Sequence, residues 1–420
     1  MAYIRRAIEA HLGKMFNQYK AVLVTGARQV GKSTMLRQVF PDQAYVSLDD
    51  PWMEDQAKAQ ASMFMMMHPA PVTIDEIQRV PELFRYIKIK CDQSEAYGLF
   101  CLSGSQAFHL MKGVSESLSG RVAVLELSGL SLRELFEDDF DKPFIPTMDY
   151  LLERKKTARD FTQTMSVWQI IHRGSYPELQ NSLKDWSGFY GNYLKTYLER
   201  DLRELSAVQD LEVFRRFMVA VAARSGEILN YSNISDEIGR DVKTIKNWIS
   251  ILETSGIIYL LEPYSANVLK RAIKSPKIYM RDTGLACYLT RWLTPETLEN
   301  GAYRGHAFET FVISEILKSY ANAGSDYRYH VSYYRGRDKL TDKTSGITSE
   351  AEIDLIIEEN GTLYPIEIKA SSHVTASETS AFTVLDKIPE KQRGMGAVVC
   401  MCPEPGMLRE NVLQRPVWYI

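Results

Sequence analysis

A short stretch near the start of the chain constrains its fold more than any other feature. Residues 26–33 read Gly-Ala-Arg-Gln-Val-Gly-Lys-Ser and satisfy the pattern G-x-x-x-x-G-K-[ST]. The apolar run AVLVT precedes this pattern, and the helix-forming run TMLRQVF follows it. In such a strand–loop–helix unit the glycines let backbone N–H groups approach phosphate oxygens, and the helix N-terminus favours negative charge. The stretch therefore predicts a triphosphate-binding loop in a domain with a parallel sheet.

The same stretch predicts ATP and Mg²⁺ as ligands. Lys32 can reach the β- and γ-phosphates, and the Ser33 hydroxyl can complete the shell of the Mg²⁺ ion. The alternative is an ordinary glycine-containing turn between a strand and a helix. The residues expected around the phosphates are Gly26, Ala27, Arg28, Gln29, Val30, Gly31, Lys32, Ser33 and Thr34.

A second signal lies at residues 71–76, where the apolar run Pro-Val-Thr-Ile ends in Asp75 and Glu76. In hydrolases with such a loop, the first acid serves the Mg²⁺ ion and the second polarises the attacking water. We therefore expect Asp75 on the metal side and Glu76 beside the water. Two solvated acids at a strand end are the alternative.

Further apolar runs alternate with helical stretches, which is typical of a parallel sheet with crossover helices. Ser105 follows one run and is expected to contact the γ-phosphate if that strand lies between the two motif-bearing strands. Arg121 begins another run and is a candidate to stabilise charge in phosphoryl transfer, in cis or across a subunit boundary. A surface role is its alternative. The predicted strands are 21–25, 45–48, 72–75, 99–103 and 122–127.

Composition limits the classes of protein to consider. Hydrophobic residues make up 45% and charged residues 25% of the chain, which is typical of a globular protein. The net charge of −3 gives no general attraction to nucleic acid, so any such contact must be local. The five cysteines lack the spacing of a zinc site and fit a reducing compartment. Without a long apolar run, we expect a cytoplasmic protein with no membrane contact.

Two local patterns predict packing. Ile4, Ile8, Leu12 and Met15 have the spacing of an amphipathic helix that packs on a domain, rather than the apolar core of a signal peptide. The methionines among residues 63–67 are expected to fill the core.

Segments along nearly the whole chain carry a family resemblance: VLVTGARQVGKST (22–34), TIDEIQ (73–78), LSGSQ (102–106), SLSGRVAVLELSGLSLREL (117–135), GSYPEL (174–179), YLKTYLERDLREL (193–205) and KSPKIYMRDTGLACYL (274–289). Together they resemble a widespread prokaryotic group of AAA+-like ATPases with a C-terminal domain of unknown function, DUF4143. The resemblance implies an ATPase with sheet order 5-1-4-3-2, which would put Ser105 between the loop and the acids. It says little about biological role.

The sequence pattern changes twice along the chain. An acidic, proline-containing stretch from about residue 137 reads as a linker, the pattern to about 300 is mainly helical, and strands return after 305. We therefore predict an α/β protein with an AAA+-like P-loop ATPase domain in residues 1–136, a helical and winged-helix domain in residues 137–300, and a restriction-endonuclease-like domain in residues 301–420.

Residues 231–264 read as helix, turn, helix and hairpin, the order of a winged helix. The second helix leaves Lys243, Lys246, Asn247 and Ser250 on its outer face. A basic outer face and a basic wing suit DNA, and packing between domains is an equal alternative. The expected basic residues of the wing are Lys270, Arg271, Lys274 and Lys277.

Residues 351–369 contain an Asn-Gly pair, the strongest short signal for a two-residue hairpin turn. The turn would place Asp354 opposite Glu367 and Glu352 opposite Lys369. Opposed carboxylates repel unless a cation or proton lies between them. The other face is expected to be a wholly apolar core face of Ile353, Leu355, Ile357, Tyr364, Ile366 and Ile368.

A divalent metal would relieve this repulsion, with Lys369 orienting water. The set resembles the D…E-x-K core of the restriction-endonuclease-like superfamily, and the expected order of helix, three strands, helix and strand matches its αβββαβ core. Glu309 stands where some of these nucleases carry an extra acid. The candidate nuclease site is therefore Asp354, Glu367, Lys369 and Glu309, and a half-buried sheet with a routine Glu352–Lys369 pair is the alternative.

These observations favour a Mg²⁺-dependent ATPase whose nucleotide state controls a DNA- or protein-binding C-terminal region. Lys32, Glu76, Ser105 and Arg121 would serve the chemistry. An ATP-regulated metal-dependent DNA nuclease and a non-hydrolysing nucleotide switch acting on a protein partner are the alternatives. Beyond ATP, the candidate partners are DNA, another protein and a second copy of the chain.

Overall fold

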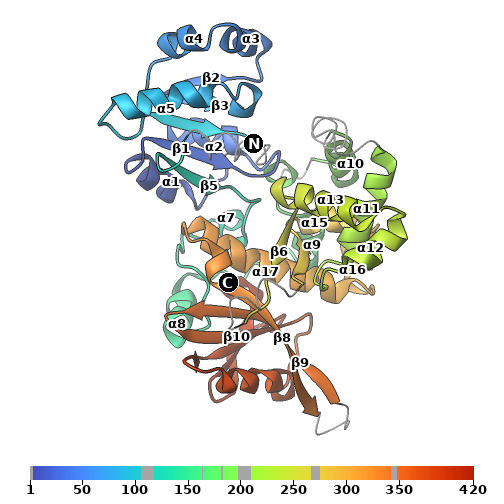
Figure 1. Ribbon diagram of the computed structural model, residues 1–420. Coiled ribbons are helices and arrows are strands. Elements are labelled where there is room, and N and C mark those ends of the chain that lie inside the picture. Colours follow the sequence, from blue (N-terminus) through green and yellow to red (C-terminus); the bar gives the residue numbers. More distant parts are fainter. Residues whose placement is uncertain are drawn as a thin grey trace.

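The computed structural model describes residues 3–105, 118–162, 164–180, 183–196, 210–265, 275–341 and 348–420, without the side chains of residues 337–341, 348 and 349. Figure 1 shows an N-terminal part (to residue 135) with a sheet, a mainly helical middle part (136–303) and a C-terminal part (304–420) with a second sheet. The chain therefore has the predicted α/β class.

Five parallel strands form the N-terminal sheet in the order β2-β3-β4-β1-β5. Read from the other edge, this is the order 5-1-4-3-2 that the resemblance implied, so that expectation is confirmed. All residues of β1, β3 and β4 are buried, because helices cover both faces of the sheet. The strands are β1 (Ala21–Thr25), β2 (Ala44–Ser47), β3 (Val72–Asp75), β4 (Phe100–Ser103) and β5 (Val122–Glu126).

The N-terminal helix is shorter than its sequence pattern predicts. It begins at Glu9, so Ile4 lies outside it, while Ile8 and Leu12 are buried in a cluster with β1. The helices of this part are α1 (Glu9–Phe16), α2 (Lys32–Val39), α3 (Pro51–Ala59), α4 (Ala61–Met67), η1 (Ile77–Arg79), α5 (Leu83–Gln93) and α7 (Leu132–Leu135).

The prediction that the methionines of α4 fill the core is wrong for three of the four. Met65 is 3% exposed, but Met63, Met66 and Met67 are 50%, 66% and 56% exposed. The reason is that α3 and α4 lie at the outer edge of the sheet beyond β2 (Figure 1), where only one face of α4 is covered.

The middle part is mainly helical, as predicted, and adds an antiparallel pair of strands, β6 (Ile258–Leu261) and β7 (Lys277–Met280). Its core is shared with its neighbours. Phe214 belongs to the same hydrophobic cluster as Val22 of β1, and Trp168 to the same cluster as Phe308 of the C-terminal part. The helices are α8 (Met148–Thr157), α9 (Val167–Arg173), η2 (Pro177–Gln180), α10 (Trp186–Thr196), α11 (Leu211–Ala223), α12 (Tyr231–Ile238), α13 (Val242–Thr254), α15 (Thr283–Leu289) and α16 (Pro295–Glu299).

The acidic stretch that reads as a linker is packed in place. Phe144 is fully buried, its N–H donates to Ser319 Oγ at 2.9 Å, and its carbonyl accepts from the Tyr320 hydroxyl at 3.0 Å. The connection from the N-terminal part therefore lies against α17 (Arg304–Asn322).

The C-terminal sheet has the strand order β13-β14-β12-β10-β9-β8, with β11 beside β10. The expected order of helix, three strands, helical stretch and strand is present, and the final strands β13 and β14 were not predicted. The elements after α17 are η4 (Tyr327–Tyr329), β8 (Val331–Thr341), β9 (Thr348–Glu359), β10 (Thr362–Lys369), η5 (Ala376–Lys387), β11 (Gln392–Arg393), β12 (Gly396–Cys400), β13 (Gly406–Arg409), β14 (Val412–Pro416) and η6 (Val417–Tyr419).

The β9–β10 hairpin has the predicted turn. Asn360 and Gly361 have φ values of 49° and 79°, both positive as a type I′ turn requires, and Glu359 pairs with Thr362.

The prediction of a single apolar face on this hairpin is wrong. The register of β8 and β9 shifts between Ser332 and Tyr334, and such a bulge changes the face on which later residues lie. Ile353 therefore packs in the cluster with η5, whereas Leu355 packs in the cluster with α17. Both faces of the sheet are covered.

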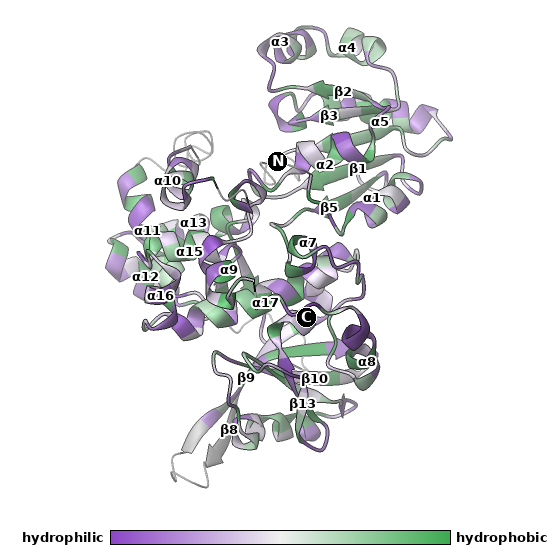
Figure 2. Ribbon diagram, turned by 180° about the vertical axis from the view of Figure 1, so that it is seen from behind, coloured by the Kyte–Doolittle hydropathy of each residue, from purple (hydrophilic) through white to green (hydrophobic). Residues whose placement is uncertain are grey.

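Figure 2 shows the strands of the N-terminal sheet as mainly hydrophobic and the outer helices as mixed. Within the ranges given above, no helix combines the length and the apolar character needed to cross a bilayer.

Candidate functional site

The loop between β1 and α2 has an unusual backbone. Gly26 and Gly31 have φ values of 143° and 94°, which residues with side chains rarely adopt. A side chain at Gly26 would also collide with the Leu127 carbonyl. Because α2 begins at Lys32, its unpaired N-terminal N–H groups lie at this loop. The geometry suits an anion.

Lys32 supplies the positive charge of the loop. It is only 6% exposed, and its ammonium donates to the carbonyls of Gly26 (3.0 Å) and Ala27 (2.9 Å). The charge is therefore held inside the loop, within reach of a phosphate bound there.

Three hydroxyl groups converge on Asp75 at the end of β3. Ser33 Oγ and Tyr45 Oη donate to Oδ2 at 2.8 Å and 2.5 Å, and Ser103 Oγ donates to Oδ1. Burial and the bond to Asp75 raise the pKa of Tyr45 above its ordinary value. The sequence paired Ser33 with Asp75 but assigned no role to Tyr45 or to Ser103, although Ser103 lies in the LSGSQ segment. Mg²⁺ prefers oxygen ligands, so the carboxylate and hydroxyl oxygens gathered here fit a Mg²⁺ site.

Glu76 follows with a φ of 56°, a left-handed conformation that is uncommon outside glycine and is often found at functional sites. Its Oε2 accepts from Ser105 Oγ at 3.3 Å and from Gln78 Nε2. Ser105 follows β4, which lies between β1 and β3. The fold thus brings Glu76 and Ser105 to the edge of the sheet that carries the loop.

A cavity of about 540 Å³ adjoins the loop, within the usual range of roughly 300–1,000 Å³ for small-molecule sites. Residues 28–34, Glu76 and Ser105 form one side. The N-terminal segment, the stretch after β5 and the middle part form the rest through Tyr3, Ile4, Arg6, Leu130, Pro177, Glu178, Tyr193 and Thr196. A nucleotide held by the loop would therefore touch the middle part as well.

Arg6 joins the loop to the segment after β5, a contact that no sequence signal indicated. Its guanidinium donates to the carbonyls of Val30 (2.8 Å) and Ser128 (2.7 Å) and pairs with Glu134 at 3.0 Å. Burial opposes the charge on Glu134, but Arg6 and backbone N–H groups hold its pKa below the ordinary value. This buried pair therefore keeps its charges.

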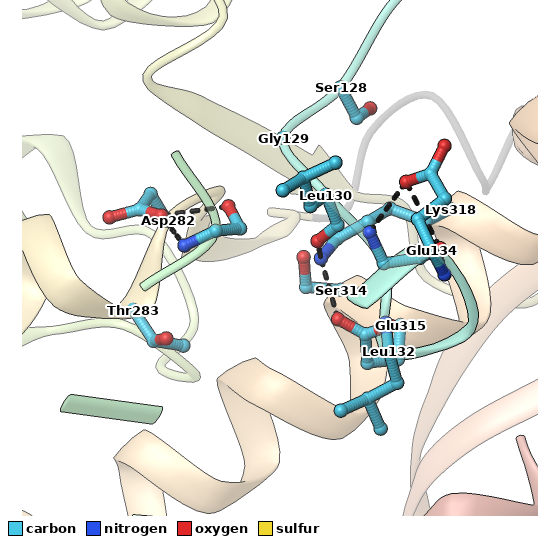
Figure 3. Close-up of polar contacts among 12 residues, drawn as sticks. Ser128, Gly129, Leu130, Leu132, Glu134, Asp282, Thr283, Ser314, Glu315 and Lys318 are labelled. Carbon is cyan, nitrogen blue, oxygen red and sulfur yellow. Dashed lines mark hydrogen bonds and ion pairs between the residues drawn. The ribbon is translucent and has the colours of Figure 1, made fainter. Parts of the chain in front are cut away.

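Residues 127–135, which we call the junction segment, contact all three parts of the chain. Besides Arg6, the Leu130 N–H donates to the Ser175 carbonyl at 2.7 Å. On α17, Lys318 Nζ donates to the Leu130 carbonyl and Glu315 Oε2 accepts from the Leu132 N–H, both at 2.8 Å (Figure 3). The segment connects the nucleotide loop to the C-terminal part.

Arg121 does not reach this site within its own chain. Its carbonyl accepts from the N–H of Ala21, at the start of β1, and its guanidinium pairs with Asp92. The loop follows the other end of β1, roughly 15 Å away. A role in cis therefore does not fit the fold, and a role across a subunit boundary stays a prediction.

The C-terminal candidates also lie together. Lys369 Nζ is 2.7 Å from Glu367 Oε1 and 3.9 Å from Asp354 Oδ2. With Glu309 and Glu352, these carboxylates form what we call the acid cluster.

Two residues of β7 complete this cluster. Lys277 Nζ is 2.7 Å from Glu352 Oε1 and 3.6 Å from Glu309 Oε1, and the Tyr279 hydroxyl donates to Glu309 at 2.6 Å. Lys277 is only 3% exposed, so its expected place in a DNA-binding wing is wrong. The other predicted wing residues, Lys270, Arg271 and Lys274, lie outside the described residues.

The acid cluster does not have the geometry of a metal site. Among the residues that the structure describes, no three carboxylate, imidazole or thiol groups are placed to hold a metal ion. Burial raises the pKa of Glu309 to about 7 and that of Glu367 well above its ordinary value, and Asp354 adds to both shifts. Because Lys277 already faces Glu309 and no three groups of the cluster are placed to hold an ion, Asp354, Glu367 and Glu309 do not fit the metal that the nuclease resemblance implied.

The outer face of α13 is exposed as predicted. Lys243, Lys246, Asn247 and Ser250 all lie at the surface, while Ile245 and Ile249 face the core. The face is therefore accessible to a partner.

Comparison with protein families confirms the resemblance drawn from the sequence. The model of an AAA domain matches residues 18–136, and the model of the domain of unknown function DUF4143 matches residues 304–417. A further domain of unknown function, DUF8612, matches residues 164–296. The N-terminal part is therefore similar to ATP-binding P-loop ATPases.

The individual relatives and solved structures that match this chain have low sequence identity to it. The chain is 27% identical over 385 residues to "Uncharacterized protein Rv2008c" of Mycobacterium tuberculosis, covering 91% of this chain and 77% of that protein. The Walker-type ATPase PABY2304 of Pyrococcus abyssi aligns with a TM-score of 0.36 and 15% identity, covering 69% of this chain and 96% of that one. AMPPCP-bound DnaA from Aquifex aeolicus aligns with a TM-score of 0.28 and 13% identity, covering 59% and 85%. Likeness at these TM-scores carries no functional argument.

Proposed function

We propose that this chain, in which an AAA domain is followed by a DUF4143 domain, is a Mg²⁺-dependent ATPase whose nucleotide state controls its C-terminal part. The proposal rests on one observation. Lys32, the Ser33–Asp75 pair and Glu76 lie at one edge of the sheet, beside a cavity large enough for a nucleotide.

Each side chain has a distinct task in this mechanism. When the nucleotide binds, the Lys32 ammonium donates to phosphate oxygens in place of the two loop carbonyls. Ser33 and Asp75 would hold the Mg²⁺ ion, which supplies neutralising charge during phosphoryl transfer. Glu76 orients the attacking water and takes its proton. Ser105 donates to Glu76 and fixes the direction of its carboxylate.

The route from the nucleotide to the C-terminal part follows a chain of buried contacts. A shift of the loop at Val30 acts on Arg6, which is tied to Glu134 in the junction segment. That segment is held in turn by Glu315 and Lys318 of α17. Because each contact is buried and directional, a change at the loop biases how α17 is held.

The nucleotide state would control the binding of a partner, either at the exposed face of α13 or at the C-terminal part. The lysines on α13 favour DNA as one such partner, since an accessible helix with basic residues can enter a groove. A protein partner and a second copy of the chain fit the same mechanism.

Phosphate release from ATP tests the proposal. We expect wild-type turnover that requires Mg²⁺, and a Glu76→Gln variant that still binds ATP but turns over at least ~100-fold more slowly, as loss of a general base does. Glu82→Gln, at the next glutamate along the chain, is the matched control and should keep wild-type turnover.

The same assay tests whether DNA is the partner. Turnover is measured with and without duplex DNA, for the wild type and for a Lys243→Ala/Lys246→Ala variant. DNA should change wild-type turnover and leave that of the variant unchanged. Wild-type protein that binds ATP but releases no phosphate under any of these conditions would instead support the non-hydrolysing switch.

A further inference from the structure

The acid cluster and its two lysines carry unequal charge. The carboxylates of Glu309, Glu352, Asp354 and Glu367 give four formal negative charges, against two positive charges from Lys277 and Lys369. Half-buried carboxylates this close together repel strongly. A cation at this place therefore stabilises the fold.

Lys277 occupies a position of the kind that a bound cation takes. Its ammonium lies between carboxylates from two different elements, α17 and β9, and 5.6 Å from the centre of the Tyr333 ring. It reaches them from β7 in the middle part. Because it is nearly inaccessible to solvent, it is a fixed part of the cluster and not a surface charge.

Carboxylate oxygens of the cluster also accept hydrogen bonds from the protein. Asp354 Oδ2 accepts from the Ile368 N–H at 2.8 Å, Glu367 Oε1 from Lys369, and Glu309 Oε1 from Tyr279. Within the part of the chain that the structure describes, the buried Glu367 Oε2 has no hydrogen-bond partner. The cluster thus holds its own donors, and because burial raises the pKa of Glu309 and of Glu367, protons offset part of the remaining negative charge.

We infer that Lys277 is a built-in counter-ion that takes the place of a divalent cation in the acid cluster, so that the cluster fastens the middle part to the C-terminal sheet. When the ammonium is removed, the side chains of these carboxylates turn toward the space it leaves and become a site for a divalent cation such as Mn²⁺. The carboxylates of this nuclease-like sheet are thereby neutralised by a lysine from the middle part of the chain. The inference is independent of ATP hydrolysis.

Mn²⁺ binding to the full chain without nucleotide, followed by electron paramagnetic resonance, tests this inference. We expect wild-type protein to show no Mn²⁺ site that depends on Asp354. Lys277→Met should gain one such site, which binds Mn²⁺ about tenfold or more tightly than any residual Asp354-dependent binding by the wild type, and the further change Asp354→Asn should abolish it. Lys277→Arg keeps the charge and should behave like the wild type.

Two results would overturn the inference. One is a wild-type Mn²⁺ site that Asp354→Asn removes, since the metal would then bind with the lysine in place. The other is a Lys277→Met protein that has a native near-ultraviolet circular dichroism spectrum but gains no Mn²⁺ site. The first comparison does not use Lys277→Met, so it can still overturn the inference if that variant fails to fold.

Discussion

At the scale of single residues, the metal side of the nucleotide site depends on how Asp75 is held. Both carboxylate oxygens accept hydroxyl groups, from Ser33 and Tyr45 on one oxygen and from Ser103 on the other. The Tyr45 ring is itself held by the Arg37 guanidinium, 4.1 Å from its centre. Residues that orient a metal-side carboxylate affect metal affinity almost as strongly as the ligands do.

Replacing Tyr45 with phenylalanine should therefore weaken the response to Mg²⁺. We expect Tyr45→Phe to raise the Mg²⁺ concentration for half-maximal turnover by about tenfold, with little change in affinity for ATP without metal. Tyr97→Phe, at a residue 60% exposed on the surface, is the control. An unchanged Mg²⁺ requirement would show that Ser33 and Ser103 orient Asp75 without Tyr45.

Glu309 makes stability depend on pH. Its pKa rises from 4.5 to about 7 in the folded chain because it is buried, with Asp354 nearby. The folded state then keeps a proton that the unfolded chain releases, so the free energy of unfolding should fall as pH rises from about 4.5 to about 7. Urea unfolding at several pH values should show this fall in the wild type and a smaller one in Glu309→Gln. The exposed Glu404→Gln is the control; identical pH profiles for wild type and Glu309→Gln would contradict the assignment.

At the scale of elements, short contiguous patterns were predictable and contacts between elements were not. The loop at residues 26–33, the acids at the end of β3 and the Asn-Gly turn are each local, and each lies where the sequence placed it. Lys277 was assigned to a wing because its charge is visible in sequence while its partners on α17 and β9 are not. The bulge in β9 likewise depends on pairing with β8, which no local pattern encodes.

The junction segment gives a prediction at this scale. A methyl group at Gly129 would lie 2.9 Å from Ser175 Cβ and 3.1 Å from its carbonyl oxygen, so Gly129→Ala should lower the free energy of unfolding by about 1–3 kcal/mol. Gly13→Ala is the matched control, because a methyl group at that position of α1 would meet nothing within 4 Å, and it should stabilise by ~0.5–1 kcal/mol. Equal stability of both variants in urea unfolding would show that the segment does not pack tightly on Ser175.

At the scale of the whole molecule, the three parts share cores and polar contacts. One hydrophobic cluster spans the N-terminal and middle parts, and another spans the middle and C-terminal parts. Arg281 of the middle part pairs with Glu126 at the end of β5, close to the nucleotide loop. A ligand in the loop is therefore placed to act on the other parts, which is why the account depends on nucleotide binding there.

Calorimetric titration of the purified chain with ATP and Mg²⁺ tests that central claim most directly. The account predicts saturable binding of one nucleotide per chain, with loss of at least ~100-fold in affinity in Lys32→Ala, since the variant lacks the ammonium proposed to bind the phosphates. Gln38→Ala, at an exposed position of the same helix outside the cavity lining, should bind ATP as the wild type does. Absence of ATP binding to wild-type protein, or equal binding by the Lys32→Ala variant, would contradict the account.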